Sequence, residues 1–98
     1  MLTLPINRIW FDKIASREKP EEYRKISPYY AARFDKHEGS PFPLRLRAGY
    51  RADSPLLECV ARANQGEGRV EWGAEPGVQY YVLALSDVVV LLEGQKKV

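Results

Sequence analysis

The sequence LRLRAGYR, residues 44–51, carries the clearest strand pattern in the chain and decides the fold class. Its side chains alternate between two faces, with Leu44, Leu46, Ala48 and Tyr50 on one and Arg45, Arg47, Gly49 and Arg51 on the other. Such a two-residue period is typical of a strand that packs one face on a core and leaves the other in solvent. The stretch therefore predicts a sheet with an apolar inner face and three arginines outside.

Further strands are expected on both sides of this stretch. Upstream, Glu21–Ile26 follows a proline and is predicted to be extended. Downstream, Leu56–Ala63 and Arg69–Trp72 are predicted to form a hairpin whose tip is Asn64–Gly68, where two glycines allow positive φ. Tyr80–Leu85 is almost wholly apolar, which is typical of a strand buried on both faces.

Two helices are expected before residue 40. The first begins after the capping residue Asn7 and ends before Pro20, and the second begins at Ser27 and Pro28 and ends at Gly39. Each has an apolar pair spaced by four residues, Trp10 with Ile14 and Tyr30 with Phe34. Five strands and two helices predict an α+β fold, a small, partly closed β-barrel with the helices flanking a cleft.

Length and composition indicate one domain over residues 1–98, with 45% hydrophobic residues, enough for a single core. The lone Cys59 and the lack of a secretory pattern predict a reducing, cytoplasmic location. The most apolar stretch, Tyr80–Leu92, is interrupted by Ser86 and Asp87, so we expect no membrane insertion.

Charge is unevenly distributed along the chain. The net charge of +2 argues against a protein that coats nucleic acid over a long track. Residues 1–51, however, carry 11 basic and 6 acidic side chains, a net +5, whereas residues 52–98 carry 4 and 7, a net −3. The first half of the chain is therefore the expected contact region for an anionic ligand.

Several kinds of site are excluded by the residues present. One histidine and one cysteine cannot assemble a zinc site, and no carboxylate cluster has ligand spacing, so neither a metal nor a cofactor is expected. His37 lies in a polar stretch and is interpreted as an exposed loop residue. Cys59 lies within a predicted strand and is interpreted as a buried, unreactive thiol.

The candidate site is the run REKPEEYR, residues 17–24. In an extended strand Glu22 and Arg24 share one face, and Lys19 reaches the same place from before Pro20. Two cations can hold a phosphate or carbonyl oxygen, while the carboxylate accepts hydrogen bonds from a base or acts as a general base. The alternative interpretation is a surface salt-bridge cluster that contributes little.

These residues also carry a resemblance to a known family. Lys19, Glu22 and Arg24 resemble the G-x-K-x-x-E-x-R signature of the ASCH domain (activating signal cointegrator homology), a relative of the PUA RNA-binding fold. Small phage and bacterial members of the family have similar segments before the signature, at residues 10–14, and later in the chain, at residues 72–77 and 80–85.

The resemblance implies a β-barrel with a cleft between barrel and helices, lined by the three signature residues, that binds RNA or a nucleotide. Arg17 stands where the family usually has glycine, and would narrow the cleft entrance or add a phosphate contact. Some members are ribonucleases, and others hydrolyse acetylated cytidine with a lysine and a threonine nucleophile. Glu22 replaces that threonine, so the enzymatic alternative is a hydrolase of acylated nucleosides or RNA in which Lys19 and Glu22 activate water.

The arginine face of residues 44–51 is a second candidate binding site. Arg45, Arg47 and Arg51 project from one side of the predicted strand and are spaced to follow phosphates, with tyrosines nearby for base stacking. An ordinary solvated sheet face is the competing interpretation. The expected partner is thus RNA, another single-stranded nucleic acid or a modified nucleotide, held by Arg17, Lys19, Glu22, Arg24 and these three arginines.

Overall fold

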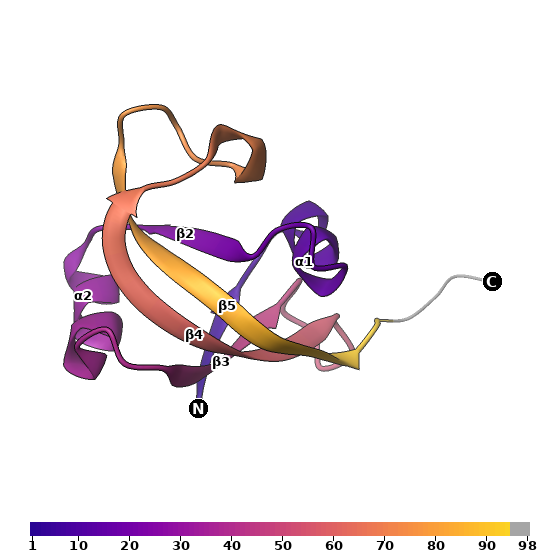
Figure 1. Ribbon diagram of the computed structural model, residues 1–98. Helices are drawn as coiled ribbons and strands as arrows, with labels where there is room; N and C mark the ends of the chain where they lie inside the picture. The colour runs from indigo at the N-terminus through magenta and orange to yellow at the C-terminus, as the bar shows by residue number, and fades with distance from the viewer. Residues whose placement is uncertain (95–98) are drawn as a thin grey trace.

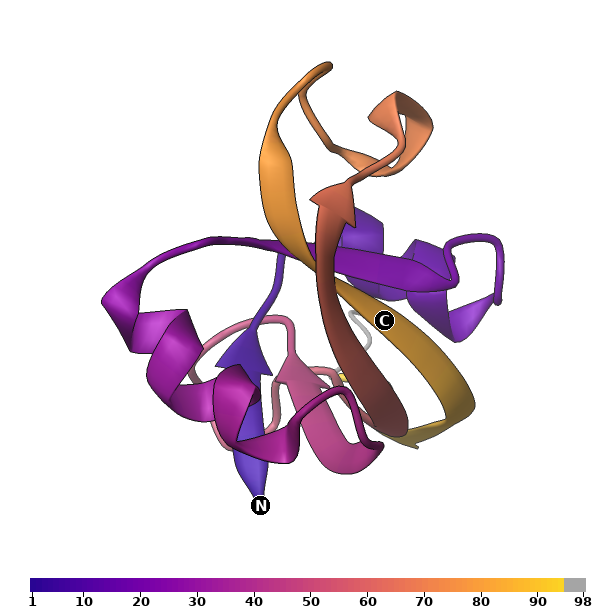
Figure 2. The same ribbon diagram turned by 60° about the vertical axis from the view of Figure 1, so that its left-hand side comes forward.

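Within residues 1–94, which the computed structural model describes, five strands form one sheet. They are β1 (Leu2–Pro5), β2 (Glu21–Lys25), β3 (Phe42–Arg47), β4 (Leu56–Glu67) and β5 (Gln79–Leu92). Their order is β1-β3-β4-β5-β2, with β1 parallel to β3 and the other neighbouring pairs antiparallel. The sheet curls into a half-barrel, visible in Figure 1 and, turned by 60°, in Figure 2. The expected α+β class with a partly closed barrel is confirmed at this level.

The two α-helices of the described chain begin where the capping residues predicted. The Asn7 side chain accepts a hydrogen bond from the Ile9 amide at 2.8 Å and starts α1 (Arg8–Ala15). Ser27 accepts from the Tyr30 amide at 3.2 Å and starts α2 (Pro28–Phe34). Short 3-10 helices follow at η1 (Asp35–His37) and η2 (Val70–Trp72). Helix α2 covers one end of the curled sheet and α1 lies toward the other (Figure 1).

The core lies between the curled sheet and the two helices. Inward side chains of β1, β3, β4 and β5 meet one face of each helix there, and the fully buried members include Leu4, Ile14, Leu44, Leu46, Leu57, Ala61 and Leu83. Phe34 of α2 stacks on Phe42 of β3, with ring centroids 5.9 Å apart. The Leu44/Leu46 face of the opening stretch is therefore the core face, as its alternation predicted.

The predicted strand over residues 44–51 ends earlier than its pattern indicated. β3 stops at Arg47, and the next residue, Ala48, donates its amide to the Pro55 carbonyl at 2.9 Å. Gly49 follows with φ 135°, a conformation that glycine adopts readily. Because this turn leaves the sheet, Tyr50 and Arg51 lie in a loop and not on the strand face.

The predicted hairpin between Leu56–Ala63 and Arg69–Trp72 is wrong. β4 continues to Glu67, and its partner is β5, with Asn64 opposite Val82 and Glu67 opposite Gln79. Residues 64–67 stay extended because β5 supplies their ladder partners, so the glycine at 66 lies within a strand. The chain turns afterwards, through η2 and the Pro76–Gly77 turn. The strand that the sequence interpretation lacked is β1, a short edge strand beside β3.

Candidate functional site

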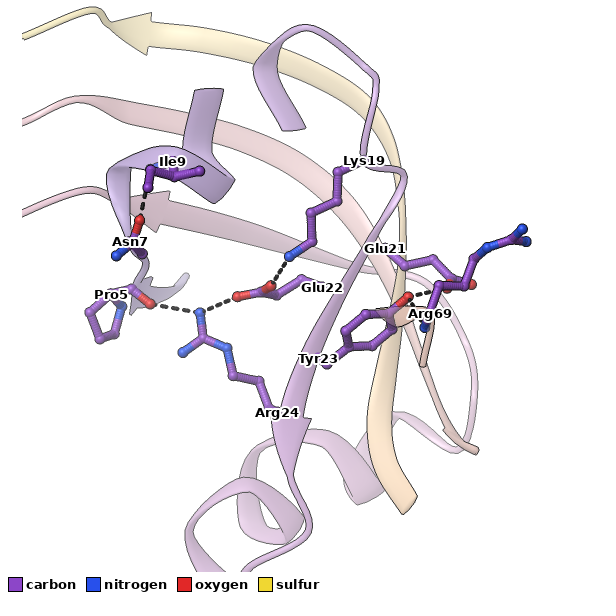
Figure 3. Close-up of polar contacts among 9 residues, drawn as sticks. All are labelled: Pro5, Asn7, Ile9, Lys19, Glu21, Glu22, Tyr23, Arg24 and Arg69. Carbon is purple, nitrogen blue, oxygen red and sulfur yellow. Dashed lines mark hydrogen bonds and ion pairs between the residues drawn. The ribbon is translucent and has the colours of Figure 1, made fainter. Parts of the chain in front are cut away.

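Lys19, Glu22 and Arg24 form a continuous ionic chain on β2 and the residues before it. The Lys19 Nζ atom lies 2.9 Å from Glu22 Oε1, and Arg24 Nη2 lies 2.7 Å from Glu22 Oε2 (Figure 3). The two cations therefore hold opposite oxygens of one carboxylate. Alternation along β2 brings Glu22 and Arg24 to one face, as the sequence predicted, and Pro20 directs Lys19 to meet them.

The ionic chain is buried, so the interpretation as a surface salt-bridge cluster is wrong. Lys19 is 2% exposed and Glu22 is 6% exposed. Charges at this depth are tolerated when they are paired and hydrogen-bonded. Lys19 Nζ also lies 4.3 Å from the ring centroid of Trp10, a cation–π geometry that compensates part of the lost hydration.

Arg24 joins the two edges of the sheet. Its Nη2 atom donates to the Pro5 carbonyl of β1 at 2.6 Å, and Nη1 donates to the Tyr30 hydroxyl of α2 at 3.0 Å. Burial by itself lowers the pKa of the Arg24 guanidinium, but the Glu22 carboxylate and the Tyr30 contact outweigh this effect and raise its pKa above the usual value. A charged Arg24 thus connects β2, β1 and α2 at the open side of the half-barrel.

A cleft of about 530 Å³ opens over this ionic chain. Its lining contains all three signature residues together with five aromatic side chains, Trp10, Tyr23, Tyr30, Trp72 and Tyr80. These come from α1, β2, α2, η2 and β5, so the cleft is assembled from segments across the whole chain. Lys25 and Glu75 add one exposed cation and one exposed anion to the lining.

Tyr23 is fixed in the wall of the cleft by two hydrogen bonds. Its hydroxyl donates to Glu21 Oε1 at 2.8 Å and accepts from the Arg69 amide at 3.0 Å (Figure 3). Burial raises the pKa of Tyr23 to about 12. The hydrogen bond from the Arg69 amide acts in the opposite direction, and the Glu21 carboxylate adds to the increase. The two hydrogen bonds therefore hold the Tyr23 ring in a fixed position in the cleft wall.

The geometry suits Glu22 for orienting cations better than for activating water. Each of its oxygens already accepts a hydrogen bond from a cation, at 2.9 and 2.7 Å. Each oxygen keeps a second lone pair, but Glu22 is 6% exposed, so a water that it could activate has little access to it. Lys19 uses one of its three ammonium hydrogens on Glu22 and lies in the floor of the cleft, where the Trp10 ring covers it and leaves its side chain 1% exposed.

The remaining arginines of the predicted site do not line the cleft. The Arg17 guanidinium donates to the Val88 carbonyl of β5 at 2.9 Å, and its backbone has φ 69°, the left-handed conformation in which glycine is unstrained. Arg45 pairs with Glu58 on β4 at 3.1 Å, and Arg47 donates to the Arg51 carbonyl at 2.8 Å. The cleft is thus built from Lys19, Glu22 and Arg24 without the arginine face.

Trp10 and Trp72 lie in apolar or periodic stretches of the sequence, a pattern that predicts core residues over stacking surfaces. Trp10 and Trp72 are half-buried and line the cleft, whereas Tyr81 is buried in the core. Their apolar sequence neighbourhoods gave no signal for this. The glycine that follows Trp72 lies against the Trp10 ring, where an added Cβ would be 2.9 Å from Cζ2. This close approach, which the sequence does not display, places the turn that carries Trp72 beside Trp10.

Cys59 and His37 have no place in the cleft lining. Cys59 is 2% exposed within β4, which confirms the prediction that it is buried, and burial together with Glu58 raises the pKa of its thiol to about 12. His37 is half-buried in η1 and stacks on Phe42 with centroids 4.3 Å apart, so it is not an exposed loop residue. Among residues 1–94, no group of three metal-ligating side chains gathers, and no helix has the length and apolarity to cross a membrane.

No protein-family model, curated protein or solved structure matches the chain. The ASCH resemblance therefore depends on the signature residues and their neighbours in this sequence.

Proposed function

We propose that the protein binds single-stranded RNA or a nucleotide in the cleft, in the manner of an ASCH-type, PUA-like module. One observation carries the proposal: both tryptophans of the chain and three tyrosines surround a buried cation–carboxylate–cation chain. Aromatic walls with a cationic floor match a ligand that has a flat base and an anionic or carbonyl oxygen. A purely structural ion pair does not require such walls.

The aromatic side chains supply the larger part of the expected affinity. Stacking of a base on an aromatic side chain contributes about 1–3 kcal/mol. Trp10 and Trp72 are half-buried, so each has a surface available within the cleft. A base between these walls places its polar edge toward Lys19, and because that side chain is 1% exposed, the Trp10 ring over it must shift before its ammonium hydrogens meet a carbonyl or phosphate oxygen.

Lys25 is the expected contact for the backbone phosphate. It is exposed at the cleft, and within the described chain it takes part in no ion pair, so a ligand phosphate meets no competing carboxylate on it. The cleft side chains Lys19, Lys25 and Arg24 outnumber the carboxylates Glu22 and Glu75 by one charge. The small excess favours one nucleotide or a short segment over a long polyanion.

Binding of a short labelled RNA at two salt concentrations tests the proposal. Intrinsic tryptophan fluorescence gives a second readout, because both tryptophans lie in the cleft. We expect Trp72→Ala to weaken binding by roughly 5- to 150-fold, and Lys25→Ala to reduce the salt dependence by about 0.7 in log–log slope. Lys36→Ala, an exposed lysine outside the cleft lining, is the matched control. Absence of binding at low salt would refute the proposal.

A further inference from the structure

A second hollow of about 460 Å³ adjoins the cleft. Both are lined by the same three residues, Pro5, Ile6 and Asn7, which form the ridge between them. Figure 3 places Pro5 and Asn7 on the side of the ionic chain opposite Tyr23. A ligand that leaves the cleft across this ridge enters the second hollow directly.

The ridge is firmly held at its cleft side. The Pro5 carbonyl accepts a hydrogen bond from Arg24 at 2.6 Å, and the Ile6 amide donates to the Arg47 carbonyl at 3.0 Å. Asn7 is fixed by its capping hydrogen bond to the Ile9 amide. The distance between the two hollows is therefore set by the fold, as a defined spacing between two subsites requires.

The far wall of the second hollow is the turn between β3 and β4, which presents Tyr50. The Tyr50 side chain is 92% exposed, the highest fraction among the exposed large hydrophobic residues of the described chain. A single exposed aromatic side chain is by itself unremarkable. This one, however, lies at the rim of a hollow and on a tightly bonded turn, which distinguishes it from a side chain on a mobile loop.

Hydrogen bonds within the turn position the Tyr50 backbone. The Arg51 amide donates to Ser54 Oγ at 3.0 Å, and the Ser54 amide donates to the Arg51 carbonyl at the same distance. Arg47 donates to that carbonyl as well, at 2.8 Å. Gly49 packs so closely on Ser54 that an added Cβ would lie 2.5 Å from Oγ. The turn is thus ordered, and the Tyr50 ring, 92% exposed, projects from it at the rim of the hollow.

The hollow has one arginine in its lining and two close to its turn in the sequence. Arg8 lines the hollow, and Arg47 and Arg51 flank the turn in sequence. Asp12 pairs with Arg8 at 2.9 Å and Asp53 with Arg51 at 3.3 Å, both with more than 40% of the side chain exposed, so these pairs are weak and can yield to a phosphate. An exposed ring with nearby cations matches a second nucleotide.

We propose that the second hollow is a subsite for the next nucleotide of a single-stranded RNA, with its base stacked on Tyr50 and its phosphate at Arg8. The proposal rests on the function assigned to the cleft, which receives the first nucleotide. It makes the preferred ligand at least a dinucleotide. It also gives the arginines of the turn a role at the rim of this hollow and outside the cleft.

Titration of a uridine series with one, two and four nucleotides tests the subsite. We expect the dinucleotide to bind roughly 5- to 150-fold more tightly than the mononucleotide. Tyr50→Ala removes this advantage and leaves mononucleotide affinity unchanged, whereas Tyr50→Phe retains it. Tyr29→Ala, a variant at an exposed tyrosine outside both linings, is the matched control and retains it too.

The outcomes separate this subsite from the cleft. A dinucleotide that binds no better than the mononucleotide, or a Tyr50→Ala protein that keeps the advantage, overturns the subsite and leaves the cleft assignment standing. Loss of mononucleotide binding in Tyr50→Ala also overturns it, because the tyrosine would then act on the cleft. Failure of every ligand to bind the unaltered protein overturns both assignments.

Discussion

Replacing Glu22 by glutamine is expected to destabilise the protein more than replacing Lys19 by methionine. Glu22→Gln removes the negative charge shared by two cations, and it leaves the Lys19 ammonium, 2% exposed, without a counter-ion. Breaking a buried ion pair from one side costs about 3–5 kcal/mol. For a domain of this size that corresponds to a fall in Tm of roughly 12–40 °C.

Lys19→Met has a milder expected effect. The variant removes the ammonium with its desolvation cost, and Glu22 keeps its 2.7 Å contact with Arg24. Methionine has a similar length and packs well against an aromatic ring such as Trp10, which lies beside Lys19. The lost hydrogen bond and the relieved desolvation act in opposite directions, so the free energy of unfolding should change by less than about 2 kcal/mol.

The double variant, with both substitutions, distinguishes charge pairing from packing. In the double variant the Lys19 ammonium is absent, so the loss of the Glu22 carboxylate leaves only Arg24 without its ion-pair partner. The double variant should therefore be more stable than Glu22→Gln alone. Urea denaturation measures the free energy of unfolding of all three variants. Far-UV circular dichroism follows the transition in place of tryptophan fluorescence, because Trp10 lies beside Lys19 and its emission would respond to the local substitution. Glu58→Gln is the matched control, since its pair with Arg45 is about 40% exposed and contributes at most about 1 kcal/mol. Additive losses in the double variant would refute the reasoning.

Three further substitutions test other parts of the structure. Burial and Glu58 raise the pKa of Cys59 from 9.0 to about 12, so the unfolded chain loses this proton first and the free energy of unfolding should fall as pH rises from about 9 to about 12. Cys59→Ala should flatten that fall in urea midpoints, and an unchanged pH profile would contradict the assignment. Gly68→Ala places a Cβ 2.7 Å from the Tyr23 ring and should cost about 1–3 kcal/mol in thermal unfolding, whereas full stability would show that the loop yields freely. Arg17→Gly relieves a backbone at φ 69° but loses the bond to the Val88 carbonyl, so stability should change by less than about 1 kcal/mol, and RNA affinity measured alongside should stay the same.

Local sequence rules predicted those parts of the fold that local interactions determine. The caps at Asn7 and Ser27 start helices as expected, and alternation through Leu44 and Leu46 identifies the core face. The grouping of Glu22 with Arg24 follows from the same two-residue period. In each case the deciding partners lie within a few residues along the chain.

The errors arose where a distant partner decides the conformation. The glycines at 66 and 68 led to the prediction of a turn over residues 64–67. These residues are extended because they pair with β5. Trp72 was predicted to lie in a strand and in the core. It instead ends the 3-10 helix η2 and lines the cleft together with Trp10. Neither partner is visible to a pattern confined to ten residues.

The sequence likewise did not predict that the ionic chain of Lys19, Glu22 and Arg24 is buried. Arg24 contacts Glu22, the Pro5 carbonyl of β1 and the Tyr30 hydroxyl of α2, so it spans the two free edges of the sheet and a helix. Lys19 meets the same carboxylate from the side of Trp10. Glu22 therefore links a cation that closes the fold to a cation that faces the cleft. Because buried pairs of this kind add little net stability compared with an apolar packing, closure alone does not require Lys19. Under the proposed function a ligand in the cleft accounts for its position beside five aromatic side chains, and the comparison of Lys19→Met stability with Lys19→Met RNA affinity separates the two roles.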